Sequence, residues 1–413
     1  MSDVIVVGGG ASGMLAALGA AEGGAGVTLL ERNEKLGKKV YITGKGRCNV
    51  TNACEPDAFR AHVVKNPRFL FSALNAFAPA DMMALLERLG CPVTVERGDR
   101  VFPRSEKASD VTRALERELK RRGVEVRLNA RARSLDLEGT RVSGVTLENG
   151  QTLAGNAVIL CTGGCSYPST GSTGDGYAWL RAAGHTVYPP LPSLIPLRSD
   201  AEWVRALQGL SLKNVRLTLK SGKKTLFTDI GEMLFTHFGV SGPLVLSASA
   251  YMAELAPEEA RLSLDLKPGL TPEQVDARLL REIDASGKKQ LRTLLCALYP
   301  SRLADAMPGL CGIPPLTLAN EATREQRARL VEAAKALDIP LSGTCPWAEA
   351  VVTRGGVSVR EIDPATMESK RVQGLYGAGE LLDVDALTGG FNLQIAFSTG
   401  LAAGKAAAGA LLP

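Results

Sequence analysis

The sequence predicts an α/β fold in which a parallel sheet carries a nucleotide-binding turn, and three observations predict it. The chain opens with an apolar strand, a glycine-rich turn, an Ala-rich helix and a second strand that ends in an acid. Apolar strands at 155–164 and 374–378 also run into glycines, as strands at a ligand-binding sheet edge do. The middle of the chain instead shows short alternating strands and then helices. We therefore expect the two ends to form one domain and the middle another.

A glycine fingerprint follows the first strand, Val4–Val7, at once. Gly8 permits a tight turn, Gly10 lets the backbone approach a diphosphate, and Gly13 lets the next helix pack close to the sheet. The N-terminus of that helix offers N–H groups and a positive dipole end to phosphates. The pattern predicts a dinucleotide-binding site at this turn.

A second strand, Val27–Leu30, ends at Glu31. A carboxylate at this position can accept hydrogen bonds from ribose hydroxyls, and it disfavours a 2′-phosphate. A lone glycine fingerprint is a weak signal, but here both strands, the helix and the acid occur in order. The context therefore supports the dinucleotide site.

Downstream segments favour FAD over a nicotinamide dinucleotide as the bound cofactor. Segment 123–135 reads as a strand that returns to the same sheet, where the backbone of Ala132 could touch adenine. The strand at 155–164 ends in Thr162-Gly163-Gly164. Near the C-terminus, a strand leads into an acidic loop and a long helix, a return that a nicotinamide-only enzyme would not need.

The C-terminal helix is expected to begin near Asn392, after the pair Gly389-Gly390. Its N-terminus could face the pyrimidine or ribityl part of a flavin, where negative charge accumulates on reduction. Asp383 could bind the ribityl hydroxyls.

The stretch "KKVYITGKGRCNVTN" gathers four cations: Lys38, Lys39, Lys45 and Arg47. Because it follows the Glu31 strand, it should run along the diphosphate and reach toward the flavin. Arg47, Cys48 and Asn49 would then be best placed to meet the isoalloxazine ring. The alternative for Cys48 is a small packed thiol.

Segments spread over nearly the whole chain resemble the BaiN/RdsA-like NAD(P)/FAD-dependent oxidoreductases, a family that includes aminoacetone-oxidase-like flavoproteins. They are "GGGASGMLAA", "KLGKKVYITGKGRCNVTN", "GEMLFTHFGVSGPLVL", "AVVTRGGVSVREIDPATMESK" and "GLYGAGELLDVDALTGGFNLQIAFSTG". One departure is visible: Lys45 stands where such sequences often have a third glycine. This places a positive charge beside the expected flavin.

The resemblance implies a Rossmann-like FAD-binding domain in two segments, 1–190 and 346–413. A β-rich, barrel-like domain at 191–268 and 338–345 would interrupt it and carry a helical insertion at 269–337. The residues themselves agree, because "PPLPSLIP" is a stiff crossing and "TPEQ" is a typical helix start.

Together, the motifs and the resemblance predict one set of FAD contacts. In chain order these are Gly8, Gly10, Ala11, Ser12, Gly13, Glu31, Arg32, Lys38, Arg47, Cys48, Asn49, Ala132, Thr162, Gly163, Gly164, Gly379, Glu380, Asp383, Gly390, Asn392, Leu393 and Gln394.

Reduction of an activated C=C bond needs a hydride from the flavin and a proton from an acid. Cys48, Tyr41 and His237 are the candidate acids, although a lone histidine is more often structural. NAD(P)H would be a transient electron donor, because "GSTGDG" at 171–176 follows a loop and does not open a second βαβ unit.

We therefore expect an FAD-dependent oxidoreductase that reduces an activated C=C bond with electrons from NAD(P)H. The resemblance leaves two substrates open: a steroid or bile-acid-type enone or enoate, or a uridine in rRNA. Two alternatives are a flavin amine oxidase of the aminoacetone type, which produces peroxide, and a flavin-bearing RNA-binding or assembly factor.

The composition excludes few classes of partner. The net charge of +5 allows an anionic partner without requiring one. Lys213, Lys220, Lys223 and Lys224 surround a hairpin that could contact RNA, but few aromatic residues accompany them. We expect a small-molecule or rRNA substrate and no stable DNA binding; the sequence does not define the oligomeric state.

The cysteines predict a reducing environment. Eight of them are scattered along the chain without zinc-ligand spacing. We see no secretory signal and no run of 18 apolar residues. The expectation is a cytoplasmic protein with no metal and no membrane contact.

Overall fold

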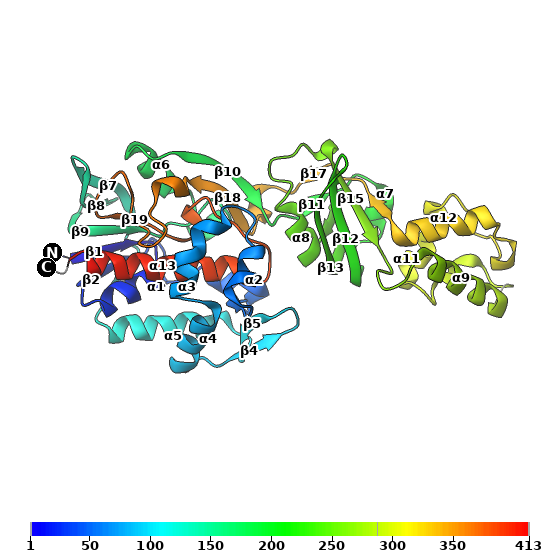
Figure 1. Cartoon of the computed structure of the whole chain (residues 1–413), viewed down its shortest axis with the longest axis horizontal. Helices are drawn as coiled ribbons and strands as arrows, with labels where there is room; N and C mark the ends of the chain where they lie inside the picture. Colours follow the sequence, from blue (N-terminus) through cyan, green and yellow to red (C-terminus); the bar gives the residue numbers. More distant parts are fainter. Residues whose placement is uncertain (1, 287, 412–413) are drawn as a thin grey trace. The chain divides into compact units, whose positions relative to one another are not determined.

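The computed structural model describes residues 2–286 and 288–411. The chain forms two compact units, Met1–Ser193 with Trp347–Pro413, and Leu194–Pro346. Figure 1 shows the secondary structure of each unit.

The first unit is built on a sheet whose central strands run parallel. Its strands are β6 (Glu125–Arg127), β2 (Val27–Leu30), β1 (Ser2–Val7), β9 (Thr152–Leu160) and β19 (Leu375–Gly377), with β8 (Arg141–Leu147) and β7 (Ala132–Glu138) beyond the start of β9. β1 pairs in parallel with β2 and β9, whereas β8 runs antiparallel to both β7 and β9. The buried apolar residues Val4–Val7 place β1 in the middle of this core.

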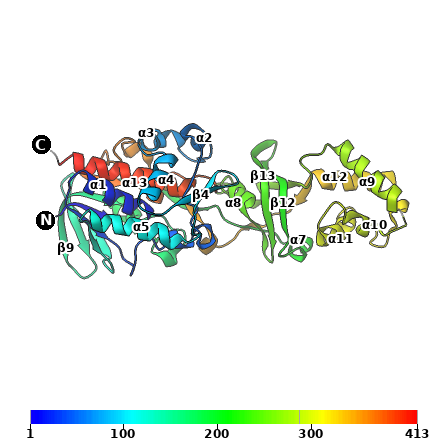
Figure 2. The same ribbon diagram turned by 90° about the horizontal axis from the view of Figure 1, so that it is seen from below.

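Two helices from opposite ends of the chain pack against each other on this sheet (Figures 1 and 2). They are α1 (Ala11–Glu22) and α13 (Phe391–Gly409). A Cβ atom at Gly400 would lie 2.2 Å from Ser12 O, and one at Gly404 would lie 2.0 Å from Ala16 O. Glycine at these positions therefore permits the close contact that brings the C-terminal segment back to the nucleotide-binding turn.

Smaller elements complete the first unit. They are α2 (Pro56–Ala61), α3 (Phe71–Ala76), α4 (Pro79–Arg88), α5 (Ala108–Arg121), α6 (Asp175–Ala182), the sheet β3 (Thr51–Asn52), β5 (Arg100–Pro103) and β4 (Val93–Glu96), and the pair β10 (Val187–Ser193) and β18 (Val352–Val357). Short 3-10 helices include η1 (Val40–Gly46), η3 (Pro168–Thr170) and η8 (Gly379–Leu381).

Within the described residues, one stretch, Pro67–Arg88, has the length and mean hydropathy (1.5) of a membrane span. Half of it is buried inside the structure. The stretch is also not one continuous helix, because α3 ends at Ala76 and α4 begins at Pro79. These features are those of core helices, so the stretch is weak evidence for a membrane contact.

The second unit contains an antiparallel sheet. Its strands are, in spatial order, β16 (Leu337–Ile339), β15 (Ala260–Asp265), β12 (Ser211–Ser221), β13 (Lys224–Thr236), β14 (Gly239–Ser241), β11 (Leu197–Arg198) and β17 (Gly343–Thr344). Among the described residues, β16 and β17 are the edges of this sheet, which forms the β-rich part of the unit.

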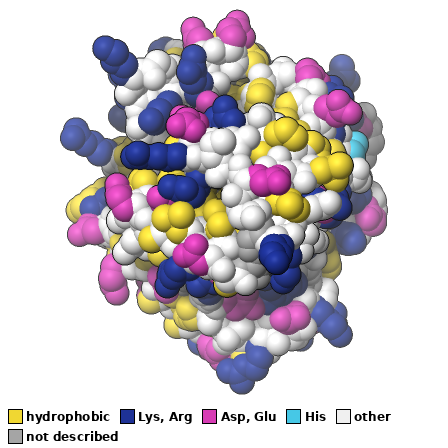
Figure 3. Space-filling view, turned by 90° about the vertical axis from the view of Figure 1, so that its right-hand side faces the viewer, with side chains coloured by type: hydrophobic (Ala, Val, Ile, Leu, Met, Phe, Trp, Pro, Cys, Tyr) yellow, Lys and Arg dark blue, Asp and Glu magenta, His cyan; other side chains and the backbone are white. Residues whose placement is uncertain are grey.

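Helices accompany this sheet. They are α7 (Glu202–Ala206), α8 (Pro243–Ser249), α9 (Pro272–Ser286), α10 (Leu291–Leu295), α11 (Ser301–Leu310) and α12 (Arg324–Lys335). On the face in Figure 3, seen from the side of α9 and α12, Lys and Arg side chains are scattered among acidic and hydrophobic ones.

Two expected elements differ in detail. Segment 123–135 is not one strand: β6 ends at Arg127, Asn129 takes a left-handed conformation (φ 53°), and β7 begins at Ala132 on the other side of the sheet. The C-terminal helix begins at Phe391, after the left-handed Gly390 (φ 96°).

Candidate functional site

The glycine fingerprint forms an open cradle at the N-terminus of α1. A Cβ at Gly8 would lie 2.4 Å from Cys161 O, and one at Gly13 would lie 1.8 Å from Gly8 O, so the packing of the protein itself requires both glycines. A Cβ at Gly10 would meet no described atom within 4 Å. Gly10 thus leaves bare backbone at a helix N-terminus, next to Ala11 and Ser12, and this surface fits a diphosphate.

The carboxylate of Glu31 is buried and turned toward this cradle. It accepts hydrogen bonds from Gly9 N–H (2.8 Å), from Asn33 N–H (2.8 Å) and from Asn33 Nδ2 (2.7 Å). A carboxylate offers about four acceptor positions, so one remains for a ribose hydroxyl.

Ala130 lies beside this acid, and the sequence analysis missed it. Its N–H donates to Glu31 O (2.9 Å). Ala132 instead pairs with Leu147 inside the β7–β8 ribbon and is buried. The left-handed turn at Asn129 causes this difference, and a strand pattern alone does not reveal it.

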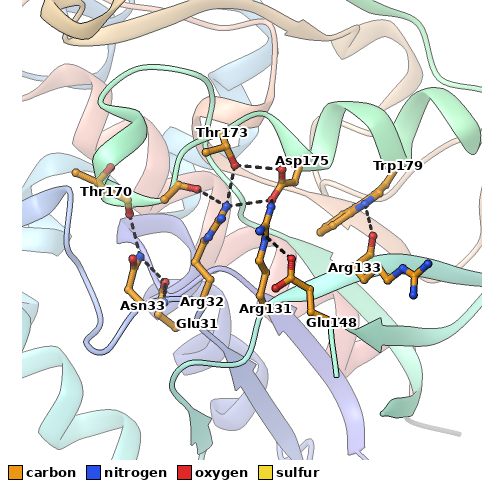
Figure 4. A network of polar contacts seen from close by, with 11 residues as sticks. Glu31, Arg32, Asn33, Arg131, Arg133, Glu148, Thr170, Thr173, Asp175 and Trp179 are labelled. Carbon is orange, nitrogen blue, oxygen red and sulfur yellow. Dashed lines mark hydrogen bonds and ion pairs between the residues drawn. The ribbon is translucent and has the colours of Figure 1, made fainter. Parts of the chain in front are cut away.

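Figure 4 shows a polar network at the end of β2. The Arg32 guanidinium donates to Thr173 Oγ1 (2.7 Å) and Asp175 Oδ2 (3.0 Å), and Asn33 Nδ2 donates to Thr170 O (2.9 Å). Arg131 adds a second contact to Asp175 (3.3 Å). The network ties the loop before α6 to the tip of β2. An FAD contact by Arg32 stays a prediction, since its guanidinium already binds this loop.

The cationic stretch runs from the cradle to the N-terminus of α13. At one end, Gly37 N–H donates to Gly9 O (2.8 Å). At the other end, the Asn49 side chain, with its amide oriented to suit its neighbours, accepts from Gly390 N–H (3.1 Å) and donates to Thr51 O (3.1 Å). The two predicted ligand-binding helix ends are therefore linked by this segment.

Most cations of the stretch are neutralised by the protein itself. Lys38 Nζ lies 3.3 Å from Glu34 Oε2. Arg47 pairs with Glu96 and with Glu106 (3.0 Å) and stacks over Phe102. The FAD contacts predicted for Lys38 and Arg47 stay predictions, because their charged groups bind acidic side chains in this structure.

Lys39 is paired with Glu380 at the centre of a half-buried network. Its Nζ lies 2.5 Å from Glu380 Oε2 and 2.6 Å from Ser166 Oγ. Glu380 Oε1 accepts from Ser166 Oγ (2.5 Å) and Thr353 N–H (2.7 Å). Burial alone would raise the pKa of Glu380, but the Lys39 ammonium and these hydrogen bonds lower it below its ordinary value. Sequence analysis did not name Ser166 or Thr353, which come from distant segments.

The candidate acids have different surroundings. Cys48 is fully buried, and burial raises the pKa of its thiol to about 12 against a smaller lowering by Thr43; both facts weigh against a proton-donating role. Tyr41 is half-buried, with Lys35 Nζ 4.5 Å from its ring centroid. His237 belongs to the second unit, between β13 and β14, and packs edge-on against Phe238.

The acidic loop before α13 holds two buried carboxylates. Asp383 Oδ2 accepts from Asn66 Nδ2 (3.1 Å), and Asp385 Oδ2 accepts from Ser193 Oγ (2.8 Å). Burial raises the pKa of Asp385 to about 6, with Asp383 adding to the shift. Asn392 fixes the loop by binding Ala386 through its side chain. Asp385, which the sequence analysis did not name, is thus a buried acid whose pKa lies well above its ordinary value.

Other predicted contacts are spread around the cradle. Thr162 Oγ1 is a buried atom without a hydrogen-bond partner among the described residues, so a ligand could satisfy it. Gly163 and Gly164 follow it, with their would-be Cβ positions taken by Ser172 and Thr353. Gly379 N–H donates to Thr399 Oγ1 (3.0 Å).

On α13, the predicted residues face the protein. Gln394 is buried and its Nε2 donates to Phe77 O (3.2 Å), while the half-buried Leu393 packs on the core. No group of three His, Cys, Asp or Glu side chains within residues 2–286 and 288–411 could hold a metal ion.

The fold and this site together define a Rossmann-type flavoprotein that binds FAD, an FAD-dependent oxidoreductase. The chain belongs to the HI0933-like family: residues 2–406 match the family described as "HI0933-like protein Rossmann domain".

Two curated relatives cover nearly the whole chain. The chain is 34% identical over 412 residues to the 3-dehydro-bile acid delta(4,6)-reductase of Clostridium scindens, with 99% of each chain covered. It is 32% identical over 399 residues to a ribosomal RNA dihydrouridine synthase of Escherichia coli, with 96% of each covered.

Solved structures share the fold. A 3-ketosteroid-delta4-(5alpha)-dehydrogenase from Rhodococcus jostii matches with a TM-score of 0.53 at 14% identity, covering 98% of this chain and 96% of that one. A flavocytochrome c3 fumarate reductase matches with a TM-score of 0.50 at 19% identity, covering 100% and 79%. At these identities the matches establish the fold alone.

Proposed function

We propose that this protein uses the electrons of FAD to reduce a C=C bond conjugated to a carbonyl group. The observation that carries the proposal is the full-length similarity to two relatives with different substrates. A delta(4,6)-reductase acting on a 3-dehydro bile acid and a dihydrouridine synthase both, by name, saturate such a bond. The shared chemistry is the part of their activity that a common site would keep.

When bound, FAD would supply the hydride chemistry. The bare backbone at Gly10 and the N-terminus of α1 would hold the diphosphate, and Glu31 would bind the ribose. The Lys39–Glu380 pair would fix the geometry of the region between the cradle and α13. The first turn of α13, after Gly390, would present its dipole to the part of the ring that gains negative charge.

Tyr41 is our preferred proton donor. Two of the candidate acids, Tyr41 and Cys48, lie in the first unit. The Tyr41 side chain is half-buried, whereas the Cys48 thiol is fully buried. A general acid must reach the substrate carbon that receives the proton. The Lys35 ammonium, 4.5 Å from the centroid of the Tyr41 ring, would help to hold the ring in place.

The substrate is either a steroid-type enone or enoate, or a uridine in rRNA, and NAD(P)H would be the transient electron donor. A cytoplasmic location suits both substrates and the scattered free cysteines.

The test is turnover under anaerobic conditions. Purified holoprotein is mixed with NADH or NADPH and with a 3-oxo-4-ene steroid acid, a uridine-containing rRNA fragment, or the saturated form of each as a control. We expect nicotinamide oxidation and a product two mass units heavier with at least one unsaturated substrate. Peroxide release from an amine in air, with no saturation of either substrate, would overturn the proposal.

A further inference from the structure

Three successive left-handed residues form the tip of the cationic stretch. They are Gly44 (φ 56°), Lys45 (φ 59°) and Gly46 (φ 87°). Glycine adopts this conformation readily, but a lysine does so only at a cost in backbone energy. Strained positions of this kind cluster where a protein holds a side chain for function.

The base of this tip is closed by the backbone. Cys48 N–H donates to Thr43 O (3.0 Å) and Arg47 N–H donates to Gly44 O (3.3 Å). Thr43 Oγ1 donates to Val40 O (2.8 Å). Lys45 therefore extends, exposed, from a short loop whose base is fixed.

The loop belongs to the segment that joins the diphosphate cradle to the N-terminus of α13. Its segment is anchored at Gly9 by Gly37 and at Gly390 by Asn49, so it spans the distance from the diphosphate cradle to the N-terminus of α13. A Cβ at Gly44 would be 2.9 Å from Asn49 N, which places the tip directly against the α13 anchor.

Among the described residues, Lys45 has no charged partner, unlike most of the cations near it in the sequence. Lys38, Lys39 and Arg47 each pair with a carboxylate, and Lys35 lies over Tyr41. Across residues 2–286 and 288–411, the Lys45 ammonium has no carboxylate partner and no aromatic ring beneath it.

We propose that Lys45 is a specificity-determining residue whose ammonium binds the carboxylate of a small anionic substrate while the conjugated C=C bond lies at the flavin. This inference rests on the proposed function and names its substrate class.

The surrounding charges favour one carboxylate over a polyanion. Glu34, Glu96, Glu106 and Glu380 neutralise the other cations of the stretch, so those cations are not free to bind a run of phosphates. RNA binding draws on many lysines and arginines at once, whereas this tip offers one unneutralised cation.

The experiment uses a matched pair of enones, a steroid acid and its methyl ester, which differ only in the charge. Steady-state kinetics are measured with the FAD-loaded wild type, Lys45→Ala, Lys45→Gly and Lys45→Arg. Lys120→Ala, which removes an exposed lysine of α5, is the control. FAD content is checked for each variant.

We expect KM for the acid to rise about tenfold in Lys45→Ala and Lys45→Gly, with kcat and the ester unchanged, and Lys45→Arg to retain tight binding. The effect should shrink as salt is raised. Equal changes for acid and ester, or no change for either, would overturn the inference. A loss confined to the rRNA fragment would also overturn it and assign the lysine to phosphate binding.

The two proposals fail separately. If the wild type reduces neither acid nor ester nor rRNA, the proposed function is wrong. If it reduces acid and ester with the same KM as Lys45→Ala does, only the assignment of Lys45 is wrong.

Discussion

Removing the charge of Lys39 should destabilise the first unit in a pH-dependent way. Lys39→Met keeps most of the aliphatic stem but leaves the Glu380 carboxylate without its cation, 2.5 Å away in the wild type. The two side chains are 23% and 19% exposed, between the surface and buried cases. We therefore expect the free energy of unfolding to fall by roughly 2 kcal/mol at pH 7.

The sign of the pH dependence follows from the pKa of Glu380. In the wild type this pKa is lowered, so the pair stabilises the fold above the unfolded-state value and the stabilisation is lost as the pH falls through the folded value. In Lys39→Met, burial raises the pKa of Glu380 with less opposition, so ionising the carboxylate costs stability as the pH rises. The gap between the two proteins should therefore widen from pH 4 to pH 7.

The assay is urea unfolding followed by circular dichroism at several pH values, with FAD in saturating excess. Glu380→Gln and the double variant complete a cycle that isolates the pair. Lys38→Met is the matched control, because its partner Glu34 is 60% exposed and its loss should have no measurable effect. A pH-independent loss, or an equal loss in the control, would refute the reasoning.

Three further predictions follow from the site. Gly13→Ala should prevent folding of the first unit, since its Cβ would lie 1.8 Å from a backbone oxygen, whereas Gly10→Ala should fold and lose FAD; circular dichroism and the flavin spectrum separate the two outcomes. Asp385 should cost about 2 kcal/mol of stability between pH 4 and pH 7, because its folded pKa is raised to about 6 and stability falls as the pH rises, and Asp385→Asn should remove that slope in urea titrations. Tyr41→Phe should slow substrate reduction about a hundredfold and leave flavin reduction by NAD(P)H unchanged in stopped-flow traces; equal slowing of both steps would contradict a proton-donating role.

Local patterns predicted the parts of the site that lie close together in the sequence. Gly8, Gly10, Gly13 and Glu31 occur within one strand–turn–helix–strand unit. The spacing of the glycines is enough to predict where the backbone must pack closely against itself or against a ligand. In the structure they lie together at the N-terminus of α1, and their contacts to FAD stay predictions.

The Glu380 network could not be predicted in the same way. Lys39, Ser166, Thr353 and Glu380 come from four distant segments, and only the packed fold brings their polar atoms within hydrogen-bond distance. None of them has a local pattern that specifies its partner.

Side-chain direction was a second limit. Arg47 was expected to meet the isoalloxazine ring, which stays a prediction; in the structure its guanidinium binds Glu96 and Glu106, which belong to a neighbouring β-hairpin and the loop after it. The adenine contact of Ala132 stays a prediction, but the residue lies in β7 after a left-handed turn at Asn129 that a strand pattern does not reveal. The sequence indicates the course of the backbone better than the partners of long charged side chains.

The central claim is that flavin in this site passes its electrons to a conjugated C=C bond. The direct measurement is an anaerobic titration of photoreduced holoprotein, which needs no nicotinamide, with a 3-oxo-4-ene steroid acid or a uridine-containing rRNA fragment. Our account predicts that the oxidised flavin spectrum returns with one of them and that one C=C bond is saturated per flavin. A flavin that stays reduced with both and is re-oxidised only by O2 would contradict the account.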